Sequence, residues 1–408
     1  MPNRKLALSF IFLTALIDSI GFGILMPVLP NLYMEITGEG LAQAAVYGGW
    51  LLFAYAIMQF FFAPVLGNLS DAYGRKPVLI ASMTALGINY LIMGFAGSLL
   101  VLFIGRLISG IGAATFSTCN AYIADSIPAE ERAQYFGLTG AAFGAGFIIG
   151  PVLGGFLGEI GSRAPFFTTA ALIFSNLIMG LLFLPESLAK ESQRSFDIRR
   201  ANPLAAMKQM SQFKVVFGII GVMFLYNMGH HVLPAVWSFY GIEKFSWSPK
   251  EIGYSLGFVG ICIVFVQGYV IRIAVPKLGL RRTGVLGLGF NLIAFIGYAY
   301  AETTLLAFIF LVPGALGALT SPAMSGIASS QIGPDQQGEL QGAIGSMVSL
   351  TSIISPLMMT MTFSIFSDGS IGIYFPGGPF LLAAFFALLS ILLFVKTTTV
   401  LTIAEQIT

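Results

Sequence analysis

The sequence predicts an all-α membrane protein with twelve transmembrane helices in two pseudo-symmetric six-helix halves. Of the 408 residues, 56% are hydrophobic and only 9% are charged, so a water-soluble domain of this size would lack a polar surface. The apolar residues form runs of about 20, the length that a helix needs to cross a bilayer. The second half of the chain also repeats features of the first, which indicates a duplicated unit.

The apolar runs define the predicted spans and divide the chain into three parts. The first six spans are expected near 6–30, 44–67, 78–97, 99–120, 135–158 and 164–184. The other six are expected near 213–240, 250–275, 283–301, 304–326, 339–366 and 375–396. The predicted organisation is an N-terminal half at 1–184, a polar cytosolic linker at 185–212 and a C-terminal half at 213–408.

The two halves match at an offset of 205 residues. Matching positions are Gly74 and Gly279, Gly112 and Gly317, and Pro151 and Pro356. Several matches at one offset, near half the chain length, indicate a parallel repeat. Transporters built in this way bind their substrate near the bilayer midplane, between the halves.

Basic residues gather on one side of the predicted topology, among them Arg75, Lys76, Arg281 and Arg282. The other side has few, at Arg163, Lys244 and Lys250. Because basic residues favour the cytosolic side, both termini are predicted to be cytosolic. No basic cluster alternates with aromatic residues as a nucleic-acid groove requires, so no nucleic-acid partner is expected.

Enzyme chemistry and cofactors have little support in the sequence. The two cysteines, Cys119 and Cys262, both fall inside predicted spans and give neither a disulfide framework nor a metal spacing. The chain has no phosphate-binding loop and no nucleotide-binding glycine fingerprint. We therefore expect no catalytic residues, no metal and no cofactor.

The segment from Gly67 to Pro77 is a charged turn between two apolar runs. Asp71 lies four residues before Arg75, close enough to pair with it or with a neighbouring helix. Gly67 and Gly74 allow backbone conformations that other residues resist. The spacing resembles the loop between spans 2 and 3 of major facilitator transporters, where it acts as a cytosolic latch. The residues to which this resemblance gives a gating role are Gly67, Asp71, Gly74, Arg75 and Asp125.

The fifth predicted span has a face of small residues. Their four-residue spacing lets two helix backbones approach closely: Ala142, Gly146, Gly150, Gly154 and Gly158. Pro151 removes one backbone donor and can bend the helix. A simple packing face is one interpretation. The segment from Gly150 to Gly155 also resembles the fifth-span signature of drug–proton antiporters, which implies a gating role for Gly150 and Pro151.

From about residue 8 to residue 360 the chain resembles the tetracycline efflux branch of the major facilitators. Matching stretches are 18–30, 63–67, 121–125, 185–187 and 349–353. The resemblance implies a bacterial inner-membrane location and proton-coupled export. Asn89, Ile263 and Asn291 stand where the branch has an acid, a histidine and an acid. These departures favour an amphipathic substrate other than metal-bound tetracycline.

Two charged residues lie deep within the predicted spans of the first half. Asp18 is about 18 Å from the cytosolic end of span 1, and Arg106 is about 10 Å from the outer end of span 4, at 1.5 Å per residue. In a core about 30 Å thick these depths nearly coincide. The two residues either pair or face one another across water. We predict that Asp18 and Arg106 couple protons and contact substrate; a purely structural ion pair is the alternative.

Neutral polar residues complete the predicted substrate site. His230 and His231 are the only histidines, and one of them can relay protons, since histidine titrates near neutral pH. Helix packing is an equally good interpretation of the histidines, and it is the better interpretation of each neutral amide taken singly. The remaining candidates for substrate binding are Gln59, Asn89, Asn227, Gln267 and Asn291.

The predicted function is secondary active transport, as a proton-coupled exporter of an amphipathic small organic molecule by alternating access. The expected partners are the substrate, protons and the lipid bilayer, and the protein is expected to be a monomer. One alternative is an uptake symporter or facilitator for a metabolite. Another is a non-transporting scaffold or sensor with the same fold.

Overall fold

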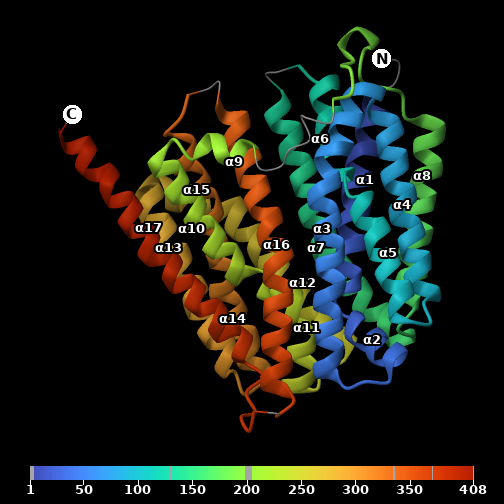
Figure 1. Cartoon of the computed structure of the whole chain (residues 1–408), viewed down its shortest axis with the longest axis vertical. Coiled ribbons are helices and arrows are strands. Elements are labelled where there is room, and N and C mark those ends of the chain that lie inside the picture. The colour runs from blue at the N-terminus through green and yellow to red at the C-terminus, as the bar shows by residue number, and fades with distance from the viewer. Residues whose placement is uncertain (1–3, 129–130, 198–204, 334–335, 370, 408) are drawn as a thin grey trace. The chain divides into compact units, whose positions relative to one another are not determined.

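The computed structural model describes residues 4–128, 131–197, 205–333, 336–369 and 371–407. These residues form helices and turns, and no strand occurs among them (Figure 1). Within this part of the chain, 11 helical runs are long and apolar enough to cross a membrane. One run, Pro249–Tyr300, has 52 residues and is broken at Gly279, so it contains two crossing segments. The predicted all-α membrane fold is confirmed.

The chain packs as two units, each built mainly from one half of the sequence. The first unit comprises Met1–Gly40, Ala54–Asn202 and Ser248–Gly257. The second comprises Leu41–Phe53, Pro203–Trp247 and Phe258–Thr408. The first turns of the second and eighth predicted spans thus belong with the unit formed by the other half.

In the first half, α1 packs along α7, and α4 packs along α8. The helices, blue to green in Figure 1, are α1 (Arg4–Leu25), α2 (Leu29–Thr37), α3 (Leu41–Tyr73), α4 (Arg75–Phe95), α5 (Leu99–Ile111), α6 (Thr115–Ser126), α7 (Arg132–Ile160) and α8 (Ala164–Phe183). The fourth predicted span is therefore two helices, α5 and α6, separated by a short break.

The face of small residues on α7 lies directly on the backbone of α1. A Cβ added at Gly150 would lie 2.6 Å from the carbonyl oxygen of Ile20. The same close approach occurs one turn to either side, between Gly146 and Leu16 and between Gly154 and Ile24. The predicted close packing of this face is confirmed, and it holds the helix that carries Asp18 in place.

In the linker and second half, α10 and α13 both pack along α17. The elements are η1 (Lys190–Ser192), α9 (Ala205–Met210), α10 (Lys214–His230), α11 (Val232–Phe245), α12 (Pro249–Phe265), the π-helical turn η3 (Val266–Val270), α13 (Ile271–Tyr300), α14 (Thr304–Leu316), η4 (Gly317–Leu319), α15 (Thr320–Ser329), α16 (Gln337–Ser367) and α17 (Gly378–Ile407). The seventh predicted span is broken at His231, between α10 and α11.

The internal repeat is visible in the positions where helices break. Helix α5 begins at Leu99 and ends at Ile111, and α14 begins and ends 205 residues later, at Thr304 and Leu316. Gly74 has φ 104° and ψ 165°, and its counterpart Gly279 has φ 76° and ψ 163°. Only glycine occupies this backbone region readily. The duplicated halves therefore share breaks as well as sequence motifs.

Candidate functional site

Asp18 lies in the middle of α1 and is partly buried. Among the described residues, no hydrogen bond and no ion pair engages its carboxylate. Of the two arrangements that the sequence allowed, a direct ion pair with Arg106 is therefore not formed in this structure. A carboxylate without such a partner is free to exchange a proton or to meet a substrate group.

Arg106 lies in α5 and is only 6% exposed. Its Nε has no hydrogen-bond partner within the part of the chain that the structure describes. The guanidinium interacts electrostatically with the hydroxyl of Tyr33, a residue of α2 that is 1% exposed. A buried cation with an unused donor is costly, so Arg106 is suited to binding an acceptor group.

Two further tyrosines link Asp18 to Arg106. Tyr55 of α3 and Tyr90 of α4 each interact electrostatically with both charged residues. The Tyr90 hydroxyl lies against α1 one turn after Asp18, 2.7 Å from where a Cβ on Gly21 would be. Three tyrosines of the first unit therefore lie within electrostatic range of Arg106, two of them also of Asp18, and their hydroxyls can donate and accept hydrogen bonds.

Sequence reasoning did not identify Tyr33, Tyr55 and Tyr90 as site residues. One signal was available, because a tyrosine inside an apolar span has a polar tip that needs a partner. The chain has 14 tyrosines in all, and that signal alone does not separate these three from the others.

The neutral candidates of the first unit differ in burial. Asn89 is 1% exposed, and its Nδ2 lies 3.7 Å from the Sδ of Met93. Its Oδ1 has no partner among the described residues and lies 3.1 Å from where a Cβ on Gly105 would be. Asn89 therefore packs beside the helix that carries Arg106. Gln59 is partly buried in α3, one turn after Tyr55.

In the second unit the two histidines lie at the break between α10 and α11. The ring of His230 stacks on Tyr226 with 5.2 Å between centroids, and its buried Nδ1 has no partner in the described part of the chain. The Nε2 of His231 lies 3.4 Å from the Oγ1 of Thr351 and 3.3 Å from the Oγ of Ser352, both in α16. The His231 ring thus lies beside two side-chain hydroxyls of α16.

The remaining amides of the second half are placed differently. Asn227 donates to the carbonyl oxygen of Met223 in its own helix, at 2.8 Å. Asn291 is 1% exposed and donates to the carbonyl oxygen of Gly317 at 3.2 Å, so it joins α13 to η4. Gln267 is exposed in the π-helical turn η3, a feature that frequently marks functional sites.

The charged segment between α3 and α4 forms a compact ion-pair network. Arg75 pairs with Asp71 of the preceding turn, and its Nε donates to the Oδ2 of Asp125 in α6 at 2.8 Å. The Arg75 side chain is 10% exposed, whereas that of Asp71 is 44% exposed. Arg75 therefore joins α3, α4 and α6 through a largely buried guanidinium.

The segment from Gly67 to Pro77 is not the turn that the sequence predicted, because most of it is helical. Helix α3 continues to Tyr73, and α4 begins at Arg75, so Gly74 is the one residue between them. Gly67 is helical, and no atom lies within 4 Å of where its Cβ would be. The expectation that Gly67 has a special backbone conformation is wrong, because α3 stays helical through Gly67 and ends only at Tyr73.

A fourth charged residue of the first unit completes the junction. The Oε1 of Glu186 accepts a hydrogen bond from the Arg75 amide at 2.7 Å, and Oε2 accepts one from the Lys76 amide at 3.1 Å. The carboxylate thus caps the first turn of α4, where amides lack helical partners and favour negative charge. Glu186 lies in one of the stretches that match the tetracycline efflux branch, but the cap itself was not predicted.

Groups of three or more histidine, cysteine, aspartate or glutamate side chains that could hold a metal ion do not occur among the described residues. The arrangement instead offers one isolated acid, one buried base and several hydroxyls within a helical membrane protein. Together with the spanning helices in two repeated halves, these features are typical of a membrane transporter.

The chain belongs to the Major Facilitator Superfamily, whose family model matches residues 11–356. The chain is therefore a transporter and not an enzyme.

The relatives agree with this assignment. The class C tetracycline resistance protein of Escherichia coli is 37% identical over 358 residues, which cover 88% of this chain and 90% of that protein. The class G tetracycline resistance protein of Vibrio anguillarum is 36% identical, over 85% of this chain and 88% of that protein. The human organic anion transporter MFSD10 has the same fold, with a TM-score of 0.72 at 22% identity, over 97% of this chain and 100% of that one.

Proposed function

We propose that this chain is a proton-coupled exporter that moves an amphipathic small organic molecule by alternating access. The observation that carries the proposal is the Asp18 carboxylate, which lies within a spanning helix with no ion pair or hydrogen bond among the described residues. Ionisable groups inside a membrane are costly and usually functional. In this proposal Asp18 carries the proton, and Arg106 adjusts its protonation and meets an electron-rich substrate group.

The substrate proposed is an amphipathic organic molecule other than metal-bound tetracycline. The two most similar relatives described above are named for tetracycline resistance, which supports export of a drug-like compound. Asn89, Ile263 and Asn291 add no negative charge for a chelated divalent cation. Tyr33, Tyr55 and Tyr90 offer apolar rings with hydroxyls that orient a bound molecule.

The proposed setting is the inner membrane of a bacterium, with both termini cytosolic and the protein acting as a monomer. The positive-inside distribution of Arg75, Lys76, Arg281 and Arg282 supports this orientation. Gly150 and Pro151 of α7 are proposed to gate, since α7 packs backbone to backbone on the helix that carries Asp18.

Proton movement in reconstituted vesicles tests the proposal. Purified protein is placed in vesicles with a pH-sensitive dye inside, and a panel of amphipathic compounds is added. Compound-dependent proton flux that is absent from empty vesicles is expected. Compound movement without proton flux would instead indicate a facilitator. Strong tetracycline resistance in a pump-deficient bacterial host, lost on Asp18→Asn, would overturn the proposed substrate class.

A further inference from the structure

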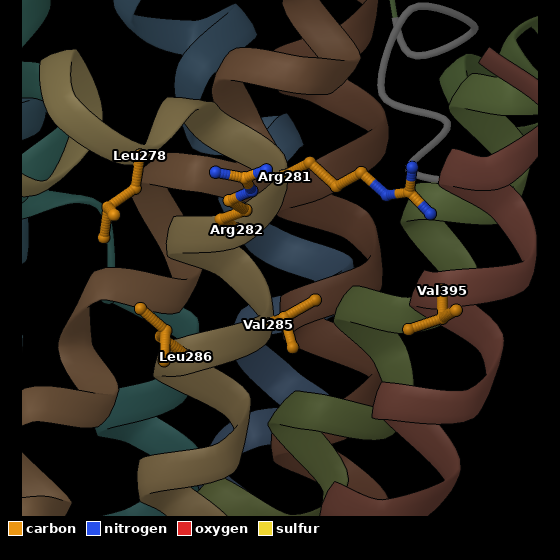
Figure 2. A pocket seen from close by; sticks show the side chains of 6 residues that line it. All are labelled: Leu278, Arg281, Arg282, Val285, Leu286 and Val395. Atoms are coloured by element: carbon orange, nitrogen blue, oxygen red, sulfur yellow. The ribbon is translucent and has the colours of Figure 1, made fainter. Parts of the chain in front are cut away.

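A cavity of about 390 Å³ opens on the second unit, over α13 and α17. Its wall combines two basic residues with four apolar ones: Leu278, Arg281, Arg282, Val285, Leu286 and Val395 (Figure 2). In Figure 2 the two arginines and Leu278 lie at one end, and Val285, Leu286 and Val395 lie further along the helices. The Arg281 side chain extends toward the helix of Val395, and the Arg282 side chain lies on the other side. The cavity therefore has a cationic end and an apolar end.

The apolar end is open to the surroundings of the helices. Leu286 is 44% exposed and Val395 is 40% exposed. Large apolar side chains exposed on a spanning helix contact lipid chains, whereas arginine places its charged end at the membrane–water boundary. The cationic end and the apolar end of the cavity thus match the headgroup region and the acyl-chain region of one bilayer leaflet.

The helix break beside the cavity, at Gly279, differs from its counterpart at Gly74 in the first half. There the Glu186 carboxylate lies against Gly74 and caps α4. At Gly279, by contrast, no described atom lies within 4 Å of where a Cβ would be. The reason is that α8 ends at Phe183 and the chain turns back to α4, whereas α17 continues as a helix to Ile407. The second half also has the glycine break and two basic residues. Among its described residues, however, no turn places a carboxylate beside Gly279.

We infer that this cavity binds an anionic phospholipid, with the phosphate at the arginine end, held by Arg282, and an acyl chain along Leu286 and Val395. The guanidinium group matches phosphate oxygens in shape and charge. Arg281 donates to the Oγ1 of Thr399 at 2.9 Å, which holds it at the cavity wall. Basic pockets between spanning helices bind anionic headgroups, and the apolar wall favours a lipid over a free hydrophilic anion.

Native mass spectrometry of the full chain in detergent tests the site, with phosphatidylglycerol and phosphatidylethanolamine as probes. The protein is expected to retain phosphatidylglycerol preferentially. Arg282→Ala should weaken its binding about fivefold, the contribution of one basic residue at an anionic surface. Arg272→Ala is the matched control, because Arg272 is an exposed arginine of the same helix that does not line the cavity.

A second variant tests the apolar end without changing charge. Val395→Trp should fill the cavity and reduce phosphatidylglycerol binding by a similar factor, while the exposed position leaves folding intact, as a monodisperse elution profile would verify. Equal lipid binding by wild type, Arg282→Ala and Val395→Trp would overturn the site. So would displacement of the lipid by millimolar inorganic phosphate, because the ligand would then be a free anion.

Discussion

The Glu186 carboxylate occupies the space where a side chain on Gly74 would lie, and it caps α4 from there. Gly74 has a backbone conformation with φ 104° that strongly favours glycine. One residue therefore satisfies two conditions, since it turns the chain between α3 and α4 and leaves room for the carboxylate. The first part of the linker is joined to the ion-pair network of Arg75 in this way.

Gly74→Ala is expected to destabilise the protein more than Gly279→Ala. Both changes impose backbone strain of about 1–3 kcal/mol. At Gly74 the new Cβ also displaces the flexible Glu186 carboxylate and removes a cap, which costs about 0.5–2 kcal/mol more. Unfolding midpoints in detergent measure the difference. Equal losses in the two variants would show that the carboxylate contributes nothing at this position.

Asp71→Asn is expected to shift the protein toward inward-facing states with little loss of folded protein. Arg75 keeps its 2.8 Å bond to Asp125 in this variant, so the junction remains intact. A pair that forms in one state only shifts the equilibrium by its own energy, about 1 kcal/mol or fivefold in population for an exposed partner. Distances between spin labels at the cytosolic ends of spans 2 and 11 report the shift.

Asp125→Asn provides the contrast for this latch. The Asp125 side chain is 21% exposed and less accessible to solvent than that of Asp71, so its loss should lower folding stability as well. Unchanged spin-label distances in Asp71→Asn would refute the latch. A shift in Asp125→Asn alone would assign the effect to packing of α4 on α6.

The helix breaks at Gly74 and Gly279 were predictable from the sequence, whereas those within the fourth and seventh predicted spans were not. Gly74 and Gly279 share an unusual backbone conformation at the predicted 205-residue offset, because glycine marks such positions in any helical chain. The breaks after α5 and α14 do not follow this rule, because Gly112 and Gly317 have negative φ values that any residue adopts. The extent of α3 was not predictable in this way, because charged residues such as Asp71 and Arg75 fit a solvated turn and an exposed helix end equally well.

The surroundings of Asp18 and Arg106 depend on information that the sequence does not contain. Periodicity places a residue on a helix, but the rotation of each helix against its neighbours decides which side chains meet. Tyr90 reaches α1 because Gly21 has no side chain at the point of contact. The sequence therefore predicted the two charged residues by their cost in lipid, whereas the three tyrosines emerged only from packing.

Glu35→Gln is expected to lower stability at neutral pH and to have no effect at low pH. The Oε2 of Glu35 accepts a hydrogen bond from Ser162, and its Oε1 accepts one from Arg163 at 3.2 Å. The Ser162 hydroxyl, and then the Arg163 charge, lower the pKa of Glu35. A lowered pKa stabilises the fold above the ordinary glutamate pKa, and this stabilisation is lost as the pH falls through the folded-state value.

The expected size is about 0.2–1 kcal/mol, since the pair is partly exposed. Thermal unfolding in detergent at pH 7 and at pH 3 measures it. Glu39→Gln is the matched control, an exposed acid close to Glu35 with no ion pair among the described residues. A destabilisation of Glu35→Gln that persists undiminished at pH 3 would contradict the assignment.

Arg106→Ala is expected to change the pH dependence of transport as well as its rate. Removing a positive charge near a carboxyl group changes the pKa of that group by about one unit or more. Tyr55 and Tyr90 interact electrostatically with both Asp18 and Arg106. Arg106→Lys keeps the charge but loses the fork of donors, so it should preserve the pH profile better than alanine does. An unchanged profile with normal activity in Arg106→Ala would leave only a packing role.

Asp18→Asn is expected to fold normally but to lose transport driven by a pH gradient. Asparagine has nearly the shape of aspartate but carries no exchangeable acid proton, and no hydrogen bond or ion pair of Asp18 is lost among the described residues. A coupling residue is needed for the proton half of the cycle only, so counterflow of substrate across vesicles at equal pH should persist. Gradient-driven flux should fall at least tenfold, a loss of about 1.4 kcal/mol or more in the coupled step. Loss of counterflow as well would place Asp18 in substrate binding, and full gradient-driven transport by the variant would remove it from coupling altogether.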